Sequence, residues 1–144
     1  MATDHRKPRK IVIVEDEVLL ALDLEMIAED VGFTVAGQAG RKNEAIDVIK
    51  SSRPDLCLVD VHLLDGPTGV DVARFAVEST DALVVFVTAN RAALPEDLVG
   101  AYGIISKPYT VSGVKDALRH LLGVINENND ADAVTPVELR ATAR

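Results

Sequence analysis

Apolar runs of strand length alternate along this chain with segments in which apolar residues recur every three or four positions. The runs predict strands at about 10–15, 33–37, 55–60, 82–88 and 102–106. The first, third and fourth runs are continuous and rich in branched residues, which is typical of central strands that are covered on both faces. The run at 33–37 is weaker and predicts a peripheral strand. Strands and helices that alternate in this way indicate a βαβ protein with a parallel sheet.

Two of the intervening segments carry a regular apolar stripe, spaced by three and four residues, that predicts a helix packed on the sheet. The first stripe consists of Leu20, Leu24, Ile27 and Val31. The last consists of Val111, Val114, Leu118, Leu121 and Ile125. Gly32 is placed to end the first of these helices. Less regular helices are predicted near 41–51 and 69–79.

The segment between the fourth and fifth strands departs from this pattern because it contains Pro95. A proline inside a regular helix costs about 3 kcal/mol. We therefore expect Pro95 to begin a short helix, with Glu96 and Asp97 in its first turn and Gly100 after its end. The fourth crossover is predicted to be a loop followed by a short or broken helix.

The chain has 144 residues, of which 48% are hydrophobic, enough to bury the core of one domain. We expect a flexible N-terminal arm at 1–8, a single domain at 9–124 and a polar tail at 125–144. Within that tail, the sequence Thr-Pro-Val-Glu from Thr135 has the spacing of a capping box, which predicts a short helix at 136–143.

Composition narrows the classes of function. The formal net charge of −8 argues against nucleic-acid binding, because phosphate contacts need a basic surface. Cys57 is the only cysteine and lies within an apolar run, where a buried thiol is the expected state. No segment approaches the ~20 apolar residues of a membrane span. We expect a cytoplasmic protein with no membrane or nucleic-acid partner.

Polar residues with chemical capability lie where the strand-like runs end. Glu15 and Asp16 follow the first run, Asp60 closes the third, Thr88 closes the fourth, and Lys107 follows the fifth. The carboxyl ends of parallel strands share one edge of a sheet, so these side chains should converge there into one acidic site. For the acidic triplet from Glu15 taken alone, the alternative is that acids simply begin a helix, where the dipole favours them.

Converging carboxylates need positive charge nearby, because each like-charge pair at ~5 Å costs roughly 3 kcal/mol at an effective dielectric of about 20. Lys107 supplies one charge, and Mg²⁺, which prefers hard oxygen ligands, would supply two. Asp16 would bind the ion directly and Glu15 through water. The backbone carbonyl of His62 could complete the ligand set.

Asp60 is the candidate nucleophile, because a carboxylate beside a metal can attack phosphorus and hold it as an aspartyl phosphate. Thr88 and Lys107 would then offer a hydroxyl and an ammonium to the phosphoryl oxygens. The side chain of His62 would contact the phosphoryl group or the attacking water, or would simply face solvent.

In order and spacing, these residues resemble the receiver domain of bacterial two-component response regulators over residues 9–124. The resemblance is carried by Ile-Val-Glu15-Asp16, Leu-Val-Asp60, Phe-Val-Thr88-Ala and Ser-Lys107-Pro108-Tyr. It implies a flavodoxin-like, doubly wound, five-stranded parallel sheet of order 2-1-3-4-5. It also implies phosphotransfer from a histidine kinase or phosphotransfer protein, a requirement for Mg²⁺, and a cis peptide bond between Lys107 and Pro108.

The chain departs from the usual family pattern at several positions. Leu63-Leu64 replaces the usual Met-Pro, the turn-rich loop at 65–69 is one residue longer, and Ile104 stands where an aromatic residue is usual. These features, with Pro95, resemble the atypical receivers of alphaproteobacteria. That set includes a group named for a Phe-Ala-Thr-Gly-like motif, whose nearest equivalent here is Phe86-Val87-Thr88-Ala89.

The sequence thus predicts a signalling switch that relays its state to a downstream protein partner, as a monomer or weak dimer. We expect residues 89–103 to be the bistable element, because Thr88 tethers their start and the broken helix should be weakly held. Thr88, Ile104 and Tyr109 are the candidate switch residues, and Tyr109 would either pack at the switch surface or cap the last helix.

Three other functions compete with this one. A phosphohydrolase would want a second acid two residues after Asp60, where His62 stands, so we expect no enzyme beyond slow autodephosphorylation. A flavodoxin-like nucleotide carrier would need a glycine- and hydroxyl-rich loop after the first strand, whereas the acids from Glu15 onward would repel phosphate. A degenerate receiver that acts only as a phosphorylation-independent docking module remains open.

Overall fold

The computed structural model describes residues 7–127 and 137–139, in which strands and helices alternate as the sequence pattern predicts. The strands are β1 (Lys10–Val14), β2 (Thr34–Ala39), β3 (Leu56–Asp60), β4 (Leu83–Thr88), β5 (Gly103–Ser106) and β6 (Val137–Leu139). The helices are α1 (Val18–Val31), α2 (Lys42–Ser52), α3 (Gly69–Ser79) and α4 (Val111–Glu127), with short 3-10 turns η1 (Arg91–Ala93) and η2 (Leu98–Gly100). The five strands and the four longer helices expected from the sequence are confirmed.

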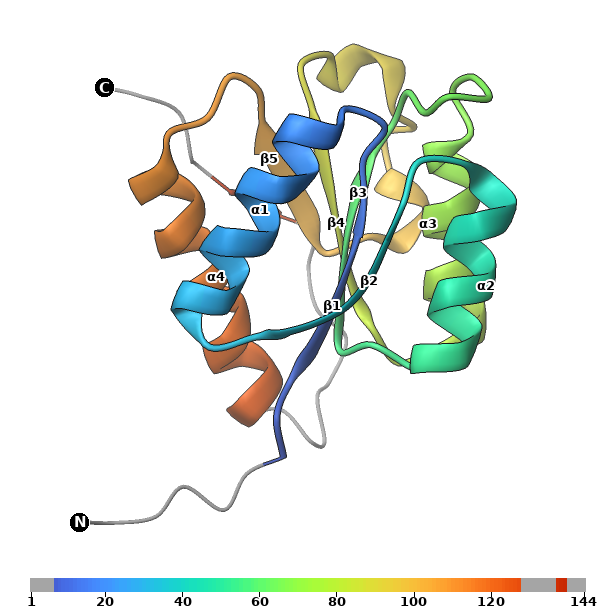
Figure 1. Cartoon of the computed structure of the whole chain (residues 1–144). Coiled ribbons are helices and arrows are strands. Elements are labelled where there is room, and N and C mark those ends of the chain that lie inside the picture. The colour runs from blue at the N-terminus through green and yellow to red at the C-terminus, as the bar shows by residue number, and fades with distance from the viewer. Residues whose placement is uncertain (1–6, 128–136, 140–144) are drawn as a thin grey trace, which may run out of the picture.

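The strands form one parallel sheet in the order β2-β1-β3-β4-β5-β6. The flavodoxin-like order 2-1-3-4-5 is therefore confirmed, and β6 adds a further strand beside β5. Helices α1 and α4 cover one face of the sheet, and α2 and α3 cover the other (Figure 1). The weakest apolar run forms β2, which lies at an edge of the sheet.

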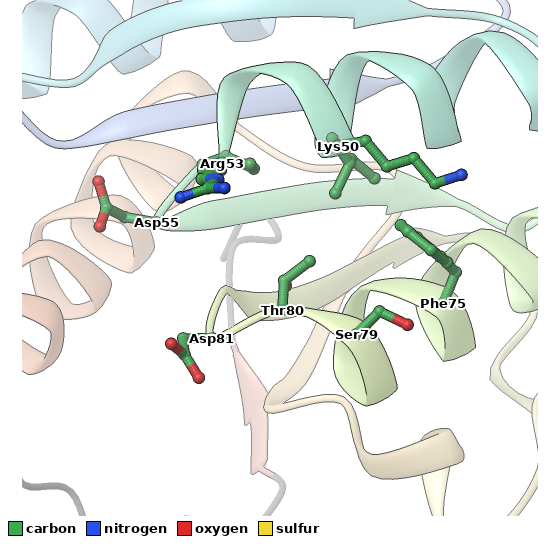
Figure 2. Close-up of a pocket in the computed structure, with 9 residues that line it drawn as sticks. Lys50, Arg53, Asp55, Phe75, Ser79, Thr80 and Asp81 are labelled. Carbon is green, nitrogen blue, oxygen red and sulfur yellow. The ribbon is translucent and has the colours of Figure 1, made fainter.

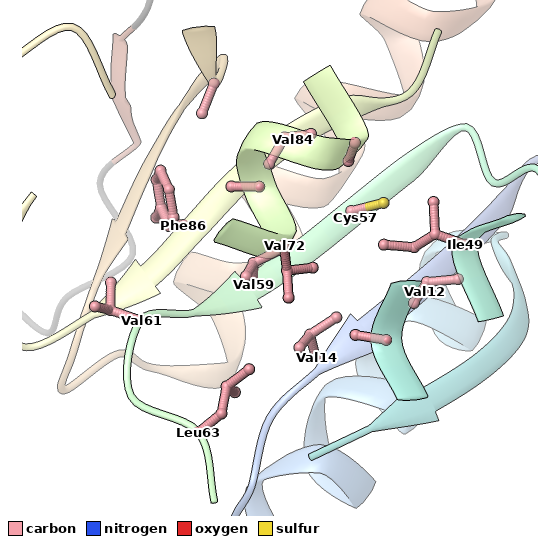
Figure 3. Packing of buried hydrophobic residues seen from close by; sticks show 14 of the residues in the cluster. Val12, Val14, Ile49, Cys57, Val59, Val61, Leu63, Val72, Val84 and Phe86 are labelled. Carbon is pink, nitrogen blue, oxygen red and sulfur yellow. The ribbon is translucent and has the colours of Figure 1, made fainter. Parts of the chain in front are cut away.

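Each central strand sends alternate side chains into two separate cores, because successive residues of a strand point to opposite faces. Ile11 and Ile13 lie in the core beneath α1 and α4, whereas Val12 and Val14 lie in the core beneath α2 and α3. Figure 3 shows the second core, where Val59 of β3 packs among its neighbours. Burial of each such side chain stabilises the fold by about 1.5–3 kcal/mol. The continuous apolar runs thus become strands that are buried on both faces.

Gly32 ends α1 as expected. Its φ of 121° lies in the region that favours glycine, and its N–H donates to the carbonyls of Ala28 and Glu29. The backbone can therefore turn directly from α1 into β2.

The fourth crossover contains only 3-10 turns, so the short or broken helix predicted there is confirmed, but it does not begin at Pro95. Instead, the carbonyl of Pro95 accepts the N–H of Leu98 in a turn, and η2 includes Gly100. Leu98 and Val99 have φ values of 54° and 48°, in the left-handed region that side chains rarely adopt. A right-handed helix cannot continue through such residues, so the crossover remains a loop with two short turns.

The tail also differs from the expectation. Val137–Leu139 form a strand rather than part of the helix predicted at 136–143, and they pair in parallel with β5. A free strand edge on β5 offers the segment backbone hydrogen bonds, which the local capping pattern could not reveal. The rest of that predicted helix and most of the predicted arm at 1–8 lie outside the described residues.

Candidate functional site

The acidic residues singled out in the sequence meet at the carboxyl edge of the sheet. β1 and β3 are neighbours with Val14 opposite Val59, so the residues that follow Val14 lie beside Asp60 at the end of β3. Carboxylate oxygens of Glu15, Asp16 and Asp60 all lie within 4.8 Å of one another. The three acids therefore converge as predicted, because parallel strands end at the same edge of the sheet.

Lys107 joins this cluster from the end of β5. Its Nζ donates to Asp60 Oδ2 at 2.8 Å and to Glu15 Oε1 at 3.0 Å. The side chains are 19% exposed for Lys107, 11% for Asp60 and 1% for Glu15, so the two ion pairs are largely shielded from water. Burial by itself would lower the pKa of the Lys107 ammonium, but its hydrogen bonds to Asp60 and Glu15 outweigh burial and the pKa is raised. Lys107 therefore remains charged throughout the ordinary pH range.

The Glu15 carboxyl group is perturbed mainly by its burial. Burial, to which the charge of Asp60 adds, raises the pKa of Glu15 from 4.5 to about 7, although hydrogen bonds from the Glu17 N–H and Lys107 act in the opposite direction. The Glu17 N–H lies 3.1 Å from Glu15 Oε2. A carboxylate in this position is only half ionised near neutral pH unless further positive charge is supplied.

Asp60 is buried as a residue but opens onto a pocket of about 250 Å³. The pocket is lined by Asp16, Glu17, Asp60, His62, Thr88, Ala89, Asn90 and Lys107. The backbone N–H of His62 lies 3.3 Å from Asp60 Oδ1, while Oδ2 accepts from Lys107. A small group that enters this pocket therefore meets the Asp60 carboxylate beside a cation. The predicted role of the His62 carbonyl as a ligand stays a prediction.

Thr88 borders the pocket from the end of β4. Its hydroxyl accepts the N–H of Asn90 at 3.0 Å, and its carbonyl accepts the N–H of Lys107 at 2.9 Å. These contacts connect the end of β4 both to the residue that begins the following loop and to the site lysine. The peptide bond between Lys107 and Pro108 is cis, as the family resemblance implied.

Gly69 is a positioning residue that the sequence reasoning did not single out, although it ends the turn-rich loop at 65–69. A Cβ added there would lie 1.9 Å from the carbonyl oxygen of Asp60, and the Gly69 N–H donates to the carbonyl of Val61 at 3.0 Å. The start of α3 thus lies directly against the backbone that carries Asp60. No feature of the sequence beyond the glycine itself could have indicated this contact.

The other two candidate switch residues lie away from the pocket lining. Ile104 is fully buried among the side chains beneath α2 and α3. Tyr109 packs against the core beneath α1 and α4, and its hydroxyl is buried without a hydrogen-bond partner among the described residues. Burial raises the pKa of Tyr109. Tyr109 is half-buried, and its packing at a switch surface, its capping of the last helix and the switching roles of both residues stay predictions.

The acidic cluster fits a divalent cation. All three carboxylates are hard oxygen donors, they approach one another within the reach of a single ion, and one ammonium, that of Lys107, pairs with two of them. Burial raises the pKa of Glu15, and the nearby charge of Asp60 adds to that rise. The residues present would therefore be stabilised by an additional cation.

A larger cavity of about 550 Å³ lies at the opposite edge of the sheet, between the C-terminal ends of α2 and α3 (Figure 2). Its labelled side chains carry charges of both signs, such as Arg53 and Asp81, and Figure 2 shows them spread around the rim rather than aimed at one point. The carboxylate of Asp55 already accepts the N–H of Lys10 at 2.8 Å. This cavity has no convergent chemistry comparable to that around Asp60.

Comparison with known proteins shows what the chain resembles. Residues 11–119 match the family model of the response regulator receiver domain. The phyllosphere-induced regulator PhyR of Methylorubrum extorquens is 34% identical over 116 residues, covering 78% of this chain and 43% of PhyR. The transcriptional regulatory protein PdtaR of Mycobacterium tuberculosis is 31% identical over 121 residues, covering 80% of this chain and 57% of PdtaR. The chain thus spans about half the length of these relatives.

Solved structures agree with this match. The solution structure of the PhyR response regulator REC domain of Erythrobacter litoralis has a TM-score of 0.75 at 28% identity, covering 88% of this chain and 97% of that domain. The crystal structure of PhyR from Brucella abortus has a TM-score of 0.67 at 29% identity, covering 81% of this chain and 47% of that protein. None of the helices within residues 7–127 has the length and apolar character needed to cross a membrane.

Proposed function

The chain belongs to the response regulator receiver domain family, and on this basis we propose that it is a phosphorylation-dependent switch of two-component signalling. In this proposal Asp60 accepts a phosphoryl group from a histidine kinase or phosphotransfer protein, with Mg²⁺, and the change is passed to a downstream protein partner. The observation that carries the proposal is the convergence of Glu15, Asp16 and Lys107 on Asp60, beside a pocket that Asp60 and Lys107 line.

The transfer uses the Asp60 carboxylate as nucleophile. A bond forms between an Asp60 carboxylate oxygen and phosphorus, while the bond from phosphorus to the donor histidine nitrogen breaks and its electron pair returns to the imidazole. Oδ1 is the freer oxygen, because its contact with the His62 N–H at 3.3 Å is long, whereas Oδ2 is held by Lys107 at 2.8 Å. Lys107 thus fixes one oxygen and leaves the other directed to the incoming group.

Four neighbouring side chains support this chemistry. Lys107 and the hydroxyl of Thr88 border the same pocket and would donate to the oxygens of the phosphoryl group. Asp16 and Glu15, with Asp60 itself, would hold Mg²⁺, which when bound neutralises charge on the transferred group. Because the pKa of Glu15 is about 7, cation binding would favour its ionised form.

The switch follows from the added charge at Asp60. Phosphorylation brings nearly two negative charges and three acceptor oxygens into the pocket. Two charge-assisted hydrogen bonds of about 1.5–3 kcal/mol each approach the ~5.5 kcal/mol needed to invert a 99:1 equilibrium. Thr88 and Lys107 would move toward the group, and Thr88 would carry residues 89–103 with it through the Asn90 N–H that its hydroxyl accepts.

An exposed apolar stripe supports a protein rather than a small molecule as the phosphoryl donor. Val18, Leu19, Leu22 and Met26 are exposed on α1, whose first turn follows directly from Asp16. Val18, Leu22 and Met26 recur every four residues, and Leu19 lies three residues before Leu22, so the four side chains share one face of the helix. A helical phosphodonor that covered this stripe would bring its histidine to the adjacent pocket. Removal of so much apolar surface from water would favour the complex.

The same proposal treats the chain as a phosphoacceptor rather than an enzyme acting on a metabolite. A water-activating acid two residues after Asp60 is missing, because His62 occupies that position and faces solvent at the pocket. Slow autodephosphorylation is therefore the most turnover we expect. In this proposal the protein acts in the cytoplasm as a monomer or weak dimer.

The test is phosphorylation by acetyl phosphate with Mg²⁺, followed by intact mass and phosphate release. We expect one phosphoryl adduct on the wild type, none on Asp60→Asn, and an unchanged adduct on the control Asp81→Asn, which alters an aspartate at the opposite edge of the sheet. Chelation of Mg²⁺ should abolish the adduct. An adduct that survives in Asp60→Asn contradicts the proposal, absence of any adduct favours the docking module, and rapid repeated phosphate release favours a phosphohydrolase.

A further inference from the structure

The outer edge of β5 is covered by a segment distant in the sequence. Val137–Leu139 pair in parallel with β5, with Gly103 opposite Val137 and Ile105 opposite Leu139. Nine residues, 128–136, separate this segment from the end of α4. Among the described residues, β6 is therefore the outermost strand on this side of the sheet.

β5 has the sequence of an internal strand. Gly103, Ile104 and Ile105 are buried, with Ile104 in one core and Ile105 in the other. The strand contains no charged residue and no proline, the usual features that keep an edge strand from pairing with other chains. The opposite edge strand, β2, also contains no charged residue or proline, but it carries exposed Thr34 and Gln38 and pairs with β1 through an irregular register. The β5 edge therefore depends on a covering strand for protection.

The covering strand is short. Three residue pairs provide few backbone hydrogen bonds. The free energy that these bonds contribute is comparable to the free-energy cost of the conformational entropy that the segment loses when it pairs. A strand held so weakly can exchange with another strand that forms the same pairing. β5 also leads directly into Lys107 at the phosphoacceptor pocket, so this edge lies one residue from the site.

We propose that the outer edge of β5 is a strand-binding surface, held in cis by Val137–Leu139, to which a downstream partner binds by supplying a parallel strand of its own. The partner segment is extended and alternates apolar, acidic and apolar residues, because that is the sequence, Val-Glu-Leu, of the segment already paired there. The inference rests on the proposed function, in which a protein partner receives the signal. The tail then acts as an intramolecular competitor of that partner.

The first experiment measures amide hydrogen exchange of Gly103–Ser106 in the full chain, unphosphorylated and without Mg²⁺. Two variants are compared, Glu138→Pro and Leu139→Pro, because proline has no backbone N–H. Successive N–H groups of a strand point to opposite sides, so one of the two variants loses an N–H that faces β5. We expect exchange at alternate β5 amides to accelerate at least tenfold in that variant, with no change in α4. The control Ala143→Pro, four residues beyond the strand, should exchange as the wild type does.

The second experiment adds a synthetic peptide with the sequence of residues 134–142 to the proline variant that exposes the edge. The peptide should bind this variant at least tenfold more tightly than the wild type and should restore protection at Gly103–Ser106. Equal exchange in all the chains, no peptide binding, or equal binding to variant and wild type would each overturn the proposal. A variant that elutes as a dimer with protected β5 amides would also overturn it, in favour of a second copy as the occupant. Neither measurement involves Asp60 phosphorylation, so failure here leaves that assay unaffected.

Discussion

Replacement of Lys107 by methionine tests whether the acidic cluster is balanced as the structure indicates. The substitution keeps most of the side-chain volume but removes the ammonium that lies 2.8 Å from Asp60 and 3.0 Å from Glu15. Near a protein surface, opposite charges about 3 Å apart attract by ~5 kcal/mol at an effective dielectric of about 20. Loss of one partner from a buried pair costs about 3–5 kcal/mol. The Lys107 side chain is 19% exposed. We therefore expect the free energy of unfolding to fall by about 3 kcal/mol at alkaline pH, the lower end of that range.

The pH dependence of this loss follows from Glu15. An unfolded Glu15 releases its proton near 4.5, whereas the folded chain holds it up to a pKa of about 7, so the free energy of unfolding falls as pH rises through that window. Without Lys107 the pKa of Glu15 rises further, and the decline extends to higher pH. The difference between wild type and Lys107→Met should therefore be larger at about pH 8.5 than at about pH 5.5.

Urea unfolding in the presence of EDTA, at both pH values, measures this difference. The matched control is Lys115→Met, because the Lys115 ammonium pairs with Asp30 at 3.5 Å on an exposed surface. In that variant the free energy of unfolding should fall by no more than about 1 kcal/mol, and by the same amount at both pH values. Addition of Mg²⁺ should recover part of the stability lost in Lys107→Met, because the cation compensates the same carboxylates. If the two variants lose equal stability, or if the loss in Lys107→Met does not grow with pH, our account of the cluster is refuted.

Two further outcomes are expected. Gly69→Ala should lower the free energy of unfolding by about 1–3 kcal/mol and slow phosphorylation, because the new Cβ would meet the Asp60 carbonyl at 1.9 Å. The control is Gly123→Ala on α4, where an added Cβ meets no atom within 4 Å, so this variant should raise the free energy of unfolding by about 0.5–1 kcal/mol. A Gly69→Ala variant as stable and active as the wild type would contradict the close approach to Asp60. Amide exchange of residues 89–103 should change when beryllofluoride and Mg²⁺ mimic the phosphoryl group, because that segment contains only short turns, whereas exchange in α4 should stay constant. An unchanged 89–103 segment would exclude it as the bistable element.

The sequence by itself determined the architecture and the composition of the site. Continuous apolar runs such as Ile11–Val14 can be buried only if both faces of a strand are covered, and this requirement leads to a parallel sheet between helical layers. Once the strands are parallel, their carboxyl ends share an edge, so Asp60 and Lys107 had to approach each other despite their distance in sequence. Local periodicity and one topological rule were sufficient for these conclusions.

Only the tertiary structure decided which atoms meet. Whether Lys107 pairs with one acid or two depends on where its ammonium lies between Glu15 and Asp60, and no spacing in the sequence encodes that distance. The same holds for the contact of Gly69 with the Asp60 carbonyl. The local sequence at Pro95 favours a helix, but the left-handed turn at Leu98 prevents one. The local sequence of the tail also favours a helix, but Val137–Leu139 pair with β5 instead. In each case the deciding interaction joins segments remote in sequence, or closes a loop between fixed ends, and such constraints exist only once the chain has folded.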